Sequence, residues 1–252
     1  MNHRISLPML AGITLVLCGA SALAFAPTGG RVMTVIGSAD ILRDQATIPA
    51  EKGGVLQSGD LLKTPVDGRL QWWMEDDSMV AMASSSQVHI RRFEPDANEA
   101  TYTLQSGAMR IISGSVHPAV LTPLAKVTAL GTDFSMFMCG TSCSGQGNGQ
   151  GNGQGSGQGQ GNGADGKNAR VLYVRVDTGR VRVQNAAGSV DASSGQIVYV
   201  ASPNSPPSII PQAPVIMVQA SLELEFDVGA GDFIPDVPVQ PIPPGEQPGS
   251  PS

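Results

Sequence analysis

Short apolar or alternating runs fill the chain from Arg31 to Val200. Gly, Asp, Asn, Pro and Ser separate these runs at intervals of about 8–12 residues, which is typical of all-β domains. No run of helical length repeats with the period of a helix. The sequence therefore predicts strands at Val32–Ile36, Asp40–Arg43, Val55–Leu56, Arg69–Met74, Val80–Ala83, Val88–Arg92, Tyr102–Leu104, Met109–Ile112, Val116–Leu121, Ala169–Val176, Gly179–Gln184 and Gln196–Val200.

The stretch from Thr122 to Phe137 organises the predicted domain. It divides into two strand-like pieces, Lys126–Leu130 and Asp133–Phe137, around Gly131-Thr132. The glycine permits a bend that a residue with a Cβ would resist. We expect a buried corner here, because this stretch carries no paired nucleophile and base.

Two adjacent tryptophans occupy the predicted strand Arg69–Met74. Because side chains alternate along a strand, Trp72 and Trp73 must face opposite sides. One is expected in the core, and the other is a surface or groove residue. Either one is a possible ligand contact. The acidic run Glu75–Ser78 follows and lacks the ligand spacing of a calcium loop, so we expect a solvated turn.

The first 24 residues have the pattern of a secretory signal peptide. Arg4 precedes an apolar run from Ile5 to Leu17, which is too short for a membrane span of about 20 residues. We expect cleavage after Ala24 and a periplasmic or secreted protein without an integral membrane segment. A lipoprotein site at Cys18 is the alternative, although the preceding Leu17 is bulky for such a site.

Charge argues against nucleic acid and anionic lipid as partners. Removal of the signal leaves 14 basic and 21 acidic residues, a net charge of −7. A phosphate-binding surface needs clustered Lys and Arg, and the one local cluster is Arg91-Arg92.

Few residues are candidates for chemistry. Cys139 and Cys143 form an even pair in an exported chain, which favours a structural disulfide over a redox motif or a metal site. His89 and His117 have no acidic or thiol partner at metal-ligand spacing. We therefore expect no enzymatic activity, cofactor or metal.

Two segments differ from the rest in composition. Residues 144–168 are rich in Gly, Gln and Asn and offer almost no apolar residue to bury, which predicts a flexible insertion. Residues 202–252 are rich in proline and are predicted to be largely disordered. Within them, Leu222–Val228 alternates apolar and acidic residues. This pattern predicts a strand that caps an edge of its own sheet or pairs with a partner.

Seven short motifs, taken together and in this order, resemble those of the FecR-domain family. They are Ser58-Gly59-Asp60-Leu61-Leu62-Lys63-Thr64, Asp77-Ser78-Met79-Val80, Leu104-Gln105-Ser106-Gly107, Thr122-Pro123-Leu124-Ala125, Gly131-Thr132-Asp133-Phe134, Asp177-Thr178-Gly179-Arg180-Val181 and Gly195-Gln196.

The resemblance implies a single all-β domain of solenoid-like or two-layer type over residues 31–200, outside the cytoplasm and without enzymatic activity. It also implies structural roles for the motif residues Gly59, Asp60, Gly107, Gly131, Thr132, Phe134, Gly179 and Gly195. The family's membrane regulators carry a sigma-factor-binding region and a transmembrane helix before this domain. A signal peptide stands there in this chain, so direct anti-sigma action is not expected.

Our leading hypothesis is an exported, non-enzymatic module that binds or senses an envelope protein or glycan. The alternative is a structural surface or matrix protein. In that case the Gly-rich insertion and the Pro-rich tail would mediate attachment or self-association.

Overall fold

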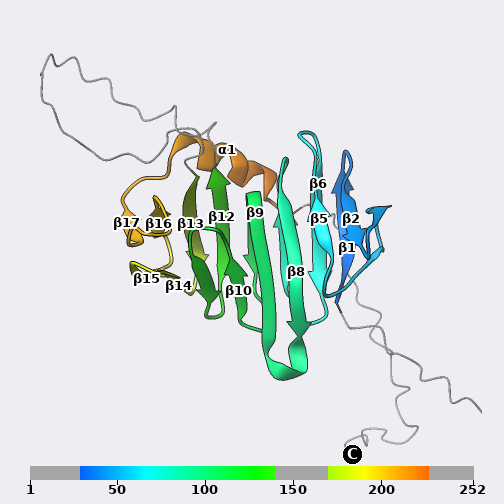
Figure 1. The fold of residues 1–252 in the computed structure, drawn as a ribbon, viewed down its shortest axis with the longest axis horizontal. Coiled ribbons are helices and arrows are strands. Elements are labelled where there is room, and N and C mark those ends of the chain that lie inside the picture. Colours follow the sequence, from blue (N-terminus) through cyan, green and yellow to red (C-terminus); the bar gives the residue numbers. More distant parts are fainter. Residues whose placement is uncertain (1–28, 140–169, 227–252) are drawn as a thin grey trace, which may run out of the picture.

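The computed structural model describes residues 29–139 and 170–226 (Figure 1). Its regular elements are almost all strands, as the sequence predicts. They are β1 (Gly30–Ile36), β2 (Asp40–Arg43), β3 (Ala46–Pro49), β4 (Val55–Leu56), β5 (Leu61–Lys63), β6 (Arg69–Met74), β7 (Met79–Met82), β8 (Gln87–Glu94), β9 (Glu99–Ile112), β10 (Pro118–Leu121), β11 (Lys126–Ala129), β12 (Asp133–Cys139), β13 (Val171–Thr178), β14 (Arg180–Asn185), β15 (Gly188–Ser193), β16 (Ile197–Val200) and β17 (Ser208–Ile210). A 3₁₀ turn, η1 (Pro95–Ala97), and the helix α1 (Val215–Glu223) complete the elements.

The strands form two layers. Sheet A has the order β4-β1-β6-β7-β9-β12-β13-β16-β17. Sheet B has the order β3-β2-β5-β8-β9-β10-β11-β14-β15. Neighbouring strands are antiparallel, except that β9 and β10 run parallel. This arrangement confirms the predicted all-β class, and of the two predicted types, solenoid-like and two-layer, it is the two-layer one.

Strand β9 belongs to both layers. Its first part pairs with β8 and β10 in sheet B, and its part from Gly107 onward pairs with β7 and β12 in sheet A. Gly107 stands at the crossing with a φ of +82°. The two short strands predicted on either side of this glycine are thus one strand that bends.

The main core lies between the two sheets. Inward residues of β6 in sheet A (Leu70, Trp72 and Met74) and of β8 in sheet B (Val88 and Ile90) are fully buried in one apolar cluster. Alternate residues on each strand face outward, as the period of two requires.

The chain passes between the two layers at two corners. Asp177-Thr178-Gly179 has the residues of a tight hairpin turn, but β13 pairs with β12 and β16, whereas β14 pairs with β11 and β15. The chain therefore passes from sheet A to sheet B at Gly179. It passes from sheet B to sheet A at Gly131-Thr132, where Thr132 is buried.

The Pro-rich segment contains two elements that the sequence analysis missed, β17 and α1. The prediction of a strand at Leu222–Val228 is wrong, because Leu222 and Glu223 lie in α1 and only residues 224–226 continue beyond it within the described chain. Pro214 precedes the helix and needs no backbone donor there. Packing of Met217 and Leu224 on sheet A then outweighs the local alternation. Order thus continues past residue 202.

Two further edge strands, β3 and β15, were also missed, because β3 has only four residues and ends in proline and β15 consists mostly of small and polar residues. Within the two described ranges, α1 is far too short to cross a membrane, and no other helix of spanning length and hydrophobicity occurs.

Candidate functional site

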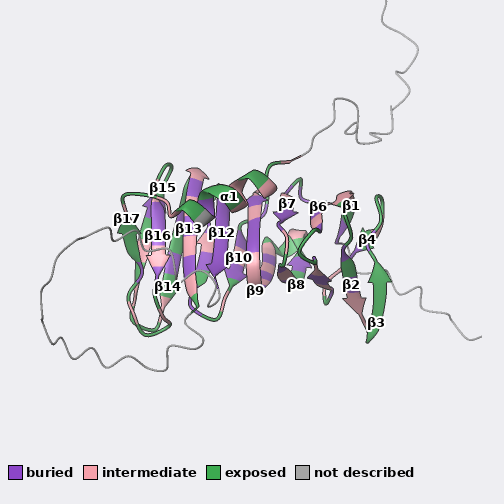
Figure 2. Cartoon of the chain, turned by 90° about the horizontal axis from the view of Figure 1, so that it is seen from above, coloured by how far each residue is buried: buried purple, intermediate pink, exposed green. Residues whose placement is uncertain are grey.

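The outer face of sheet A carries a second apolar cluster, separate from the main core. Helix α1 lies on this face beside β12 (Figure 2). We call residues 213–226 the strap. The cluster joins small and aromatic residues of the sheet to the strap and consists of Ala81, Ala83, Ala108, Phe137, Ile197, Met217 and Leu224.

Three hydrogen bonds fasten the strap to the sheet. The backbone N–H of Ser84 donates to Glu223 Oε2 at 3.0 Å, and Arg175 donates to Ser221 Oγ at 3.3 Å. Beyond the helix, Gln71 Nε2 donates to the carbonyl oxygen of Glu225 at 2.7 Å. The strap is therefore held at several points along its length.

Three arginines project from the same face. Arg110 makes a two-pronged ion pair with Asp133, at 2.8 and 2.7 Å, and its guanidinium lies 5.5 Å from the centre of the Phe226 ring. Hydrogen bonding to Asp133 raises the pKa of Arg110, and Asp177 and Glu225 add to the effect. Arg175 pairs with Asp177, and Arg69 lies 4.0 Å from Glu223.

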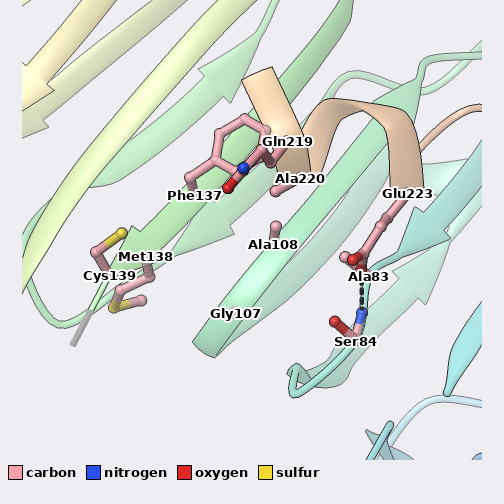
Figure 3. A pocket seen from close by; sticks show the side chains of 10 residues that line it. All are labelled: Ala83, Ser84, Gly107, Ala108, Phe137, Met138, Cys139, Gln219, Ala220 and Glu223. Carbon is pink, nitrogen blue, oxygen red and sulfur yellow. Dashed lines mark hydrogen bonds between the residues drawn. The ribbon is translucent and has the colours of Figure 1, made fainter. Parts of the chain in front are cut away.

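A pocket of about 250 Å³ remains between α1 and the sheet. Figure 3 shows Phe137 and Gln219 on one side of the pocket, and on the other side the Glu223 carboxylate, which accepts a hydrogen bond from the backbone of Ser84. The residues that line the pocket are mostly apolar, and one carboxylate, that of Glu223, and one amide, that of Gln219, lie on the side of the helix. The lining residues are Ala83, Ser84, Gly107, Ala108, Phe137, Met138, Cys139, Gln219, Ala220 and Glu223. Such a site can hold an apolar group and satisfy a few hydrogen bonds.

The tryptophans face opposite sides, as predicted. Trp72 is fully enclosed in the main core, so it has no surface to offer a ligand. Trp73 is half-buried and, by alternation from Gln71, lies on the outer face of sheet A that the strap crosses. Ligand contact at Trp73 stays a prediction.

Asp60 and its neighbours form a buried structural motif. The fully buried carboxylate of Asp60 accepts two hydrogen bonds from Arg43, both 2.7 Å, and one from the backbone N–H of Gln57 at 2.8 Å. Gly59 has a φ of +97° and donates its N–H to the carbonyl of Ile90. This motif positions β5 and β8 and lies apart from the strap.

The other motif residues stand at bends or in the core. Gly131, Gly179 and Gly195 have positive φ at the corners where strands change direction, whereas Phe134 is fully buried between the sheets. Thr132 is buried, and its hydroxyl has no hydrogen-bond partner.

The predicted solvated turn at Glu75–Ser78 is wrong for Asp76. This carboxylate is buried and accepts hydrogen bonds from Ser78 Oγ at 2.6 Å and from the backbone N–H groups of Ser78 and Val116, both at 3.2 Å. A run of three acidic residues resembles an exposed turn, and its sequence alone does not show which residue points inward.

The remaining candidates are not brought together. Cys139 is buried at the end of β12, and Cys143 lies outside the described residues, so their pairing stays a prediction. His89 is half-buried on the outer face of sheet B, and burial, followed by the charge of Arg91, lowers its pKa. His117 is exposed. Among the residues that the structure describes, no three His, Cys, Asp or Glu side chains gather to hold a metal.

Comparison with known proteins gives a family and a fold neighbour. Residues 60–145 match the family model described as FecR protein. No curated protein matches the chain. Two crystal structures of a "putative anti-sigma factor" from Parabacteroides distasonis are similar to it at 14% identity and a TM-score of 0.43. The similarity covers 64% of this chain and 64% and 63% of those two chains.

The family match begins at Asp60 and includes the β9 crossing, the corner at Gly131-Thr132 and Phe134. The motifs at Asp177 and Gly195 lie beyond it. Over residues 60–145 this chain is therefore similar to the FecR protein family.

Proposed function

We propose that this chain is an exported, non-enzymatic module that binds or senses a partner in the cell envelope, and that the outer face of sheet A is its contact surface. Two lines support the proposal. FecR proteins are regulatory and typically associated with the envelope. The N-terminal residues 1–24 also have the pattern of a signal peptide.

The choice of the outer face of sheet A rests on one observation. The space between the two sheets is filled by side chains, whereas the outer face of sheet A has a half-open apolar pocket bordered by Glu223, Gln219 and Ser84. Apolar pockets with a few convergent polar groups are the usual places where proteins bind ligands and peptide anchors.

Site-specific crosslinking in intact cells tests this proposal. A photoreactive amino acid replaces Gln219 at the pocket, and a matched variant carries it at Gln184, an exposed position on the outer face of sheet B. We expect one envelope protein or glycan to be captured from position 219 and not from position 184. Capture of the same partner from both positions, or from neither, would contradict the choice of surface.

One more variant distinguishes the binding module from the alternative, a matrix protein. Deletion of residues 144–168 leaves capture from position 219 unchanged if the β domain binds the partner. Loss of capture on deletion, or recovery of nothing but copies of the chain itself, would favour the matrix role.

A further inference from the structure

The helix of the strap has little stability of its own. It has nine residues, and its N-cap residue, Pro214, makes no side-chain hydrogen bond. Isolated helices shorter than about 12–15 residues are marginal in water, so α1 depends on its packing against sheet A. Three of its apolar residues face solvent instead: Val215, Val218 and Leu222 are 57%, 53% and 67% exposed.

The strap also fits the sheet imperfectly. The pocket under α1 leaves about 250 Å³ between the helix and Ala83, Ala108 and Phe137. Atoms that line an unfilled space lose dispersion contacts that closer packing would supply. A better-fitting segment would therefore gain dispersion contacts with the sheet that α1 does not make.

The sheet beneath the strap presents groups that suit an acidic peptide. Arg69 lies along it, as does Arg175, which also pairs with Asp177 of the sheet. The backbone N–H of Ser84 donates a hydrogen bond to a carboxylate, and the Gln71 amide donates one to a main-chain carbonyl. The strap supplies matching chemistry with Glu223, Glu225 and the anchor Leu224.

We propose that the outer face of sheet A is a docking surface for an acidic peptide segment with apolar anchors from a partner protein, and that the strap occupies this surface when the partner is absent. This inference rests on the proposed function, since it names the chemistry of the partner. A competing segment would displace residues 213–226 and take over the contacts with Ser84, Gln71 and Arg175.

The test uses a fluorescent peptide with the sequence of residues 213–226 and measures its binding to the full chain by anisotropy. Leu224→Ala removes a fully buried anchor of the strap, and Leu222→Ala is the matched control because Leu222 is exposed. We expect the peptide to bind the Leu224→Ala protein at least about tenfold more tightly than the unchanged protein, because the apparent affinity rises with the fraction of open surface. Leu222→Ala should bind as the unchanged protein does.

Two further arms make the result decisive. Hydrogen exchange shows whether the strap has opened in Leu224→Ala. If the amides of the strap remain protected from exchange, Ser221→Pro is used instead, because proline breaks α1 in its interior. A peptide with Glu223 and Glu225 changed to Gln should bind at least about threefold more weakly if the arginines recognise charge. No gain in peptide binding by a protein whose strap is open would overturn the proposal.

The failure of this inference differs from the failure of the proposed function. Capture of an envelope partner from position 219 without peptide binding refutes the docking surface alone. Peptide binding without capture of any envelope partner refutes the proposed function alone. If light scattering shows that opening the strap converts the protein into a dimer, the occupant is a second copy, and the partner-protein proposal is overturned.

Discussion

At the scale of single residues, the glycines at the bends differ in what excludes a side chain. Gly107 has a φ of +82°, and a Cβ there would meet the side chain of Ser86 and lie 2.5 Å from its Cα. Gly131 has a φ of +69°, but open space surrounds the position of its Cβ. Gly107 is thus required for both conformation and space, whereas Gly131 is required for conformation alone.

Gly107→Ala is expected to destabilise the protein by about 3 kcal/mol, since it combines a left-handed backbone with overpacking at the β9 crossing. Gly131→Ala should cost about 1 kcal/mol, the conformational part alone. Urea denaturation measures both. Equal losses of unfolding free energy in the two variants would show that the contact between the new Cβ at position 107 and Ser86 costs nothing.

Asp60 provides a second contrast at this scale. Asp60→Ala should cost about 3 kcal/mol, because the Arg43 guanidinium and the Gln57 N–H lose their acceptor inside the protein. Asp191→Ala removes an ion pair of similar geometry with Arg182, but that pair is exposed, so no measurable change is expected. A small effect at Asp60 would contradict the structural role assigned to the motif.

The surroundings of His89 predict that the stability of the protein depends on pH. Burial lowers its pKa in the folded protein, assisted by Arg91, although the carbonyl of Gly59 and the carboxylate of Asp60 act in the opposite direction. The unfolded chain then binds the proton more readily, and stability falls as the pH drops below the unfolded value of about 6.5.

The free energy of unfolding between pH 7 and 5 should therefore decline less steeply in His89→Gln than in the unchanged protein. His117→Gln is the control, since His117 is exposed. Identical slopes for His89→Gln and the unchanged protein would show that His89 does not contribute.

At the scale of elements, the strap is the part of the molecule most ready to move. It joins the domain through β17, a strand of three residues, and it packs on one face of sheet A. Elements with few buried contacts open locally at a lower free energy than the core strands.

Leu224→Ala should therefore loosen residues 213–226 before it affects the β domain. We expect faster hydrogen exchange in α1 and a local loss of about 2–3 kcal/mol, the usual cost of truncating a buried leucine. Leu222→Ala should leave exchange in α1 unchanged. Faster global unfolding with no change in hydrogen exchange in α1 would contradict this view of the strap.

At the scale of the whole molecule, the two layers depend on pairings between distant parts of the chain. Strands β12 and β13 pair along their whole lengths, from Asp133 opposite Thr178 to Cys139 opposite Val171, although 31 residues separate Cys139 from Val171. The two strands are joined edge to edge whatever lies between them.

Deletion of residues 144–168 should change the free energy of unfolding by no more than about 1 kcal/mol, because loop-closure entropy varies slowly with loop length. Calorimetry of the deletion variant tests this. A loss of several kcal/mol would show that the Gly-rich insertion contributes contacts to the domain.

The sequence by itself determined most of the strands. Period-two alternation is a local property, so it placed Trp72 and Trp73 on opposite faces of one strand, although it did not show which of the two lies inward. Positive-φ positions such as Gly107 and Gly131 were equally local, since glycine adopts them at little cost.

Only the tertiary structure decided which strands pair and what covers sheet A. Asp177-Thr178-Gly179 has the residues of a hairpin turn, yet β13 and β14 lie in different sheets, and each pairs with two other strands. Residues 215–223 form a helix because Met217, together with Leu224 just beyond it, buries apolar surface against Ala108 and Phe137. This burial stabilises the helix only when distant strands are already assembled, and therefore no local pattern could have predicted the pocket or the strap.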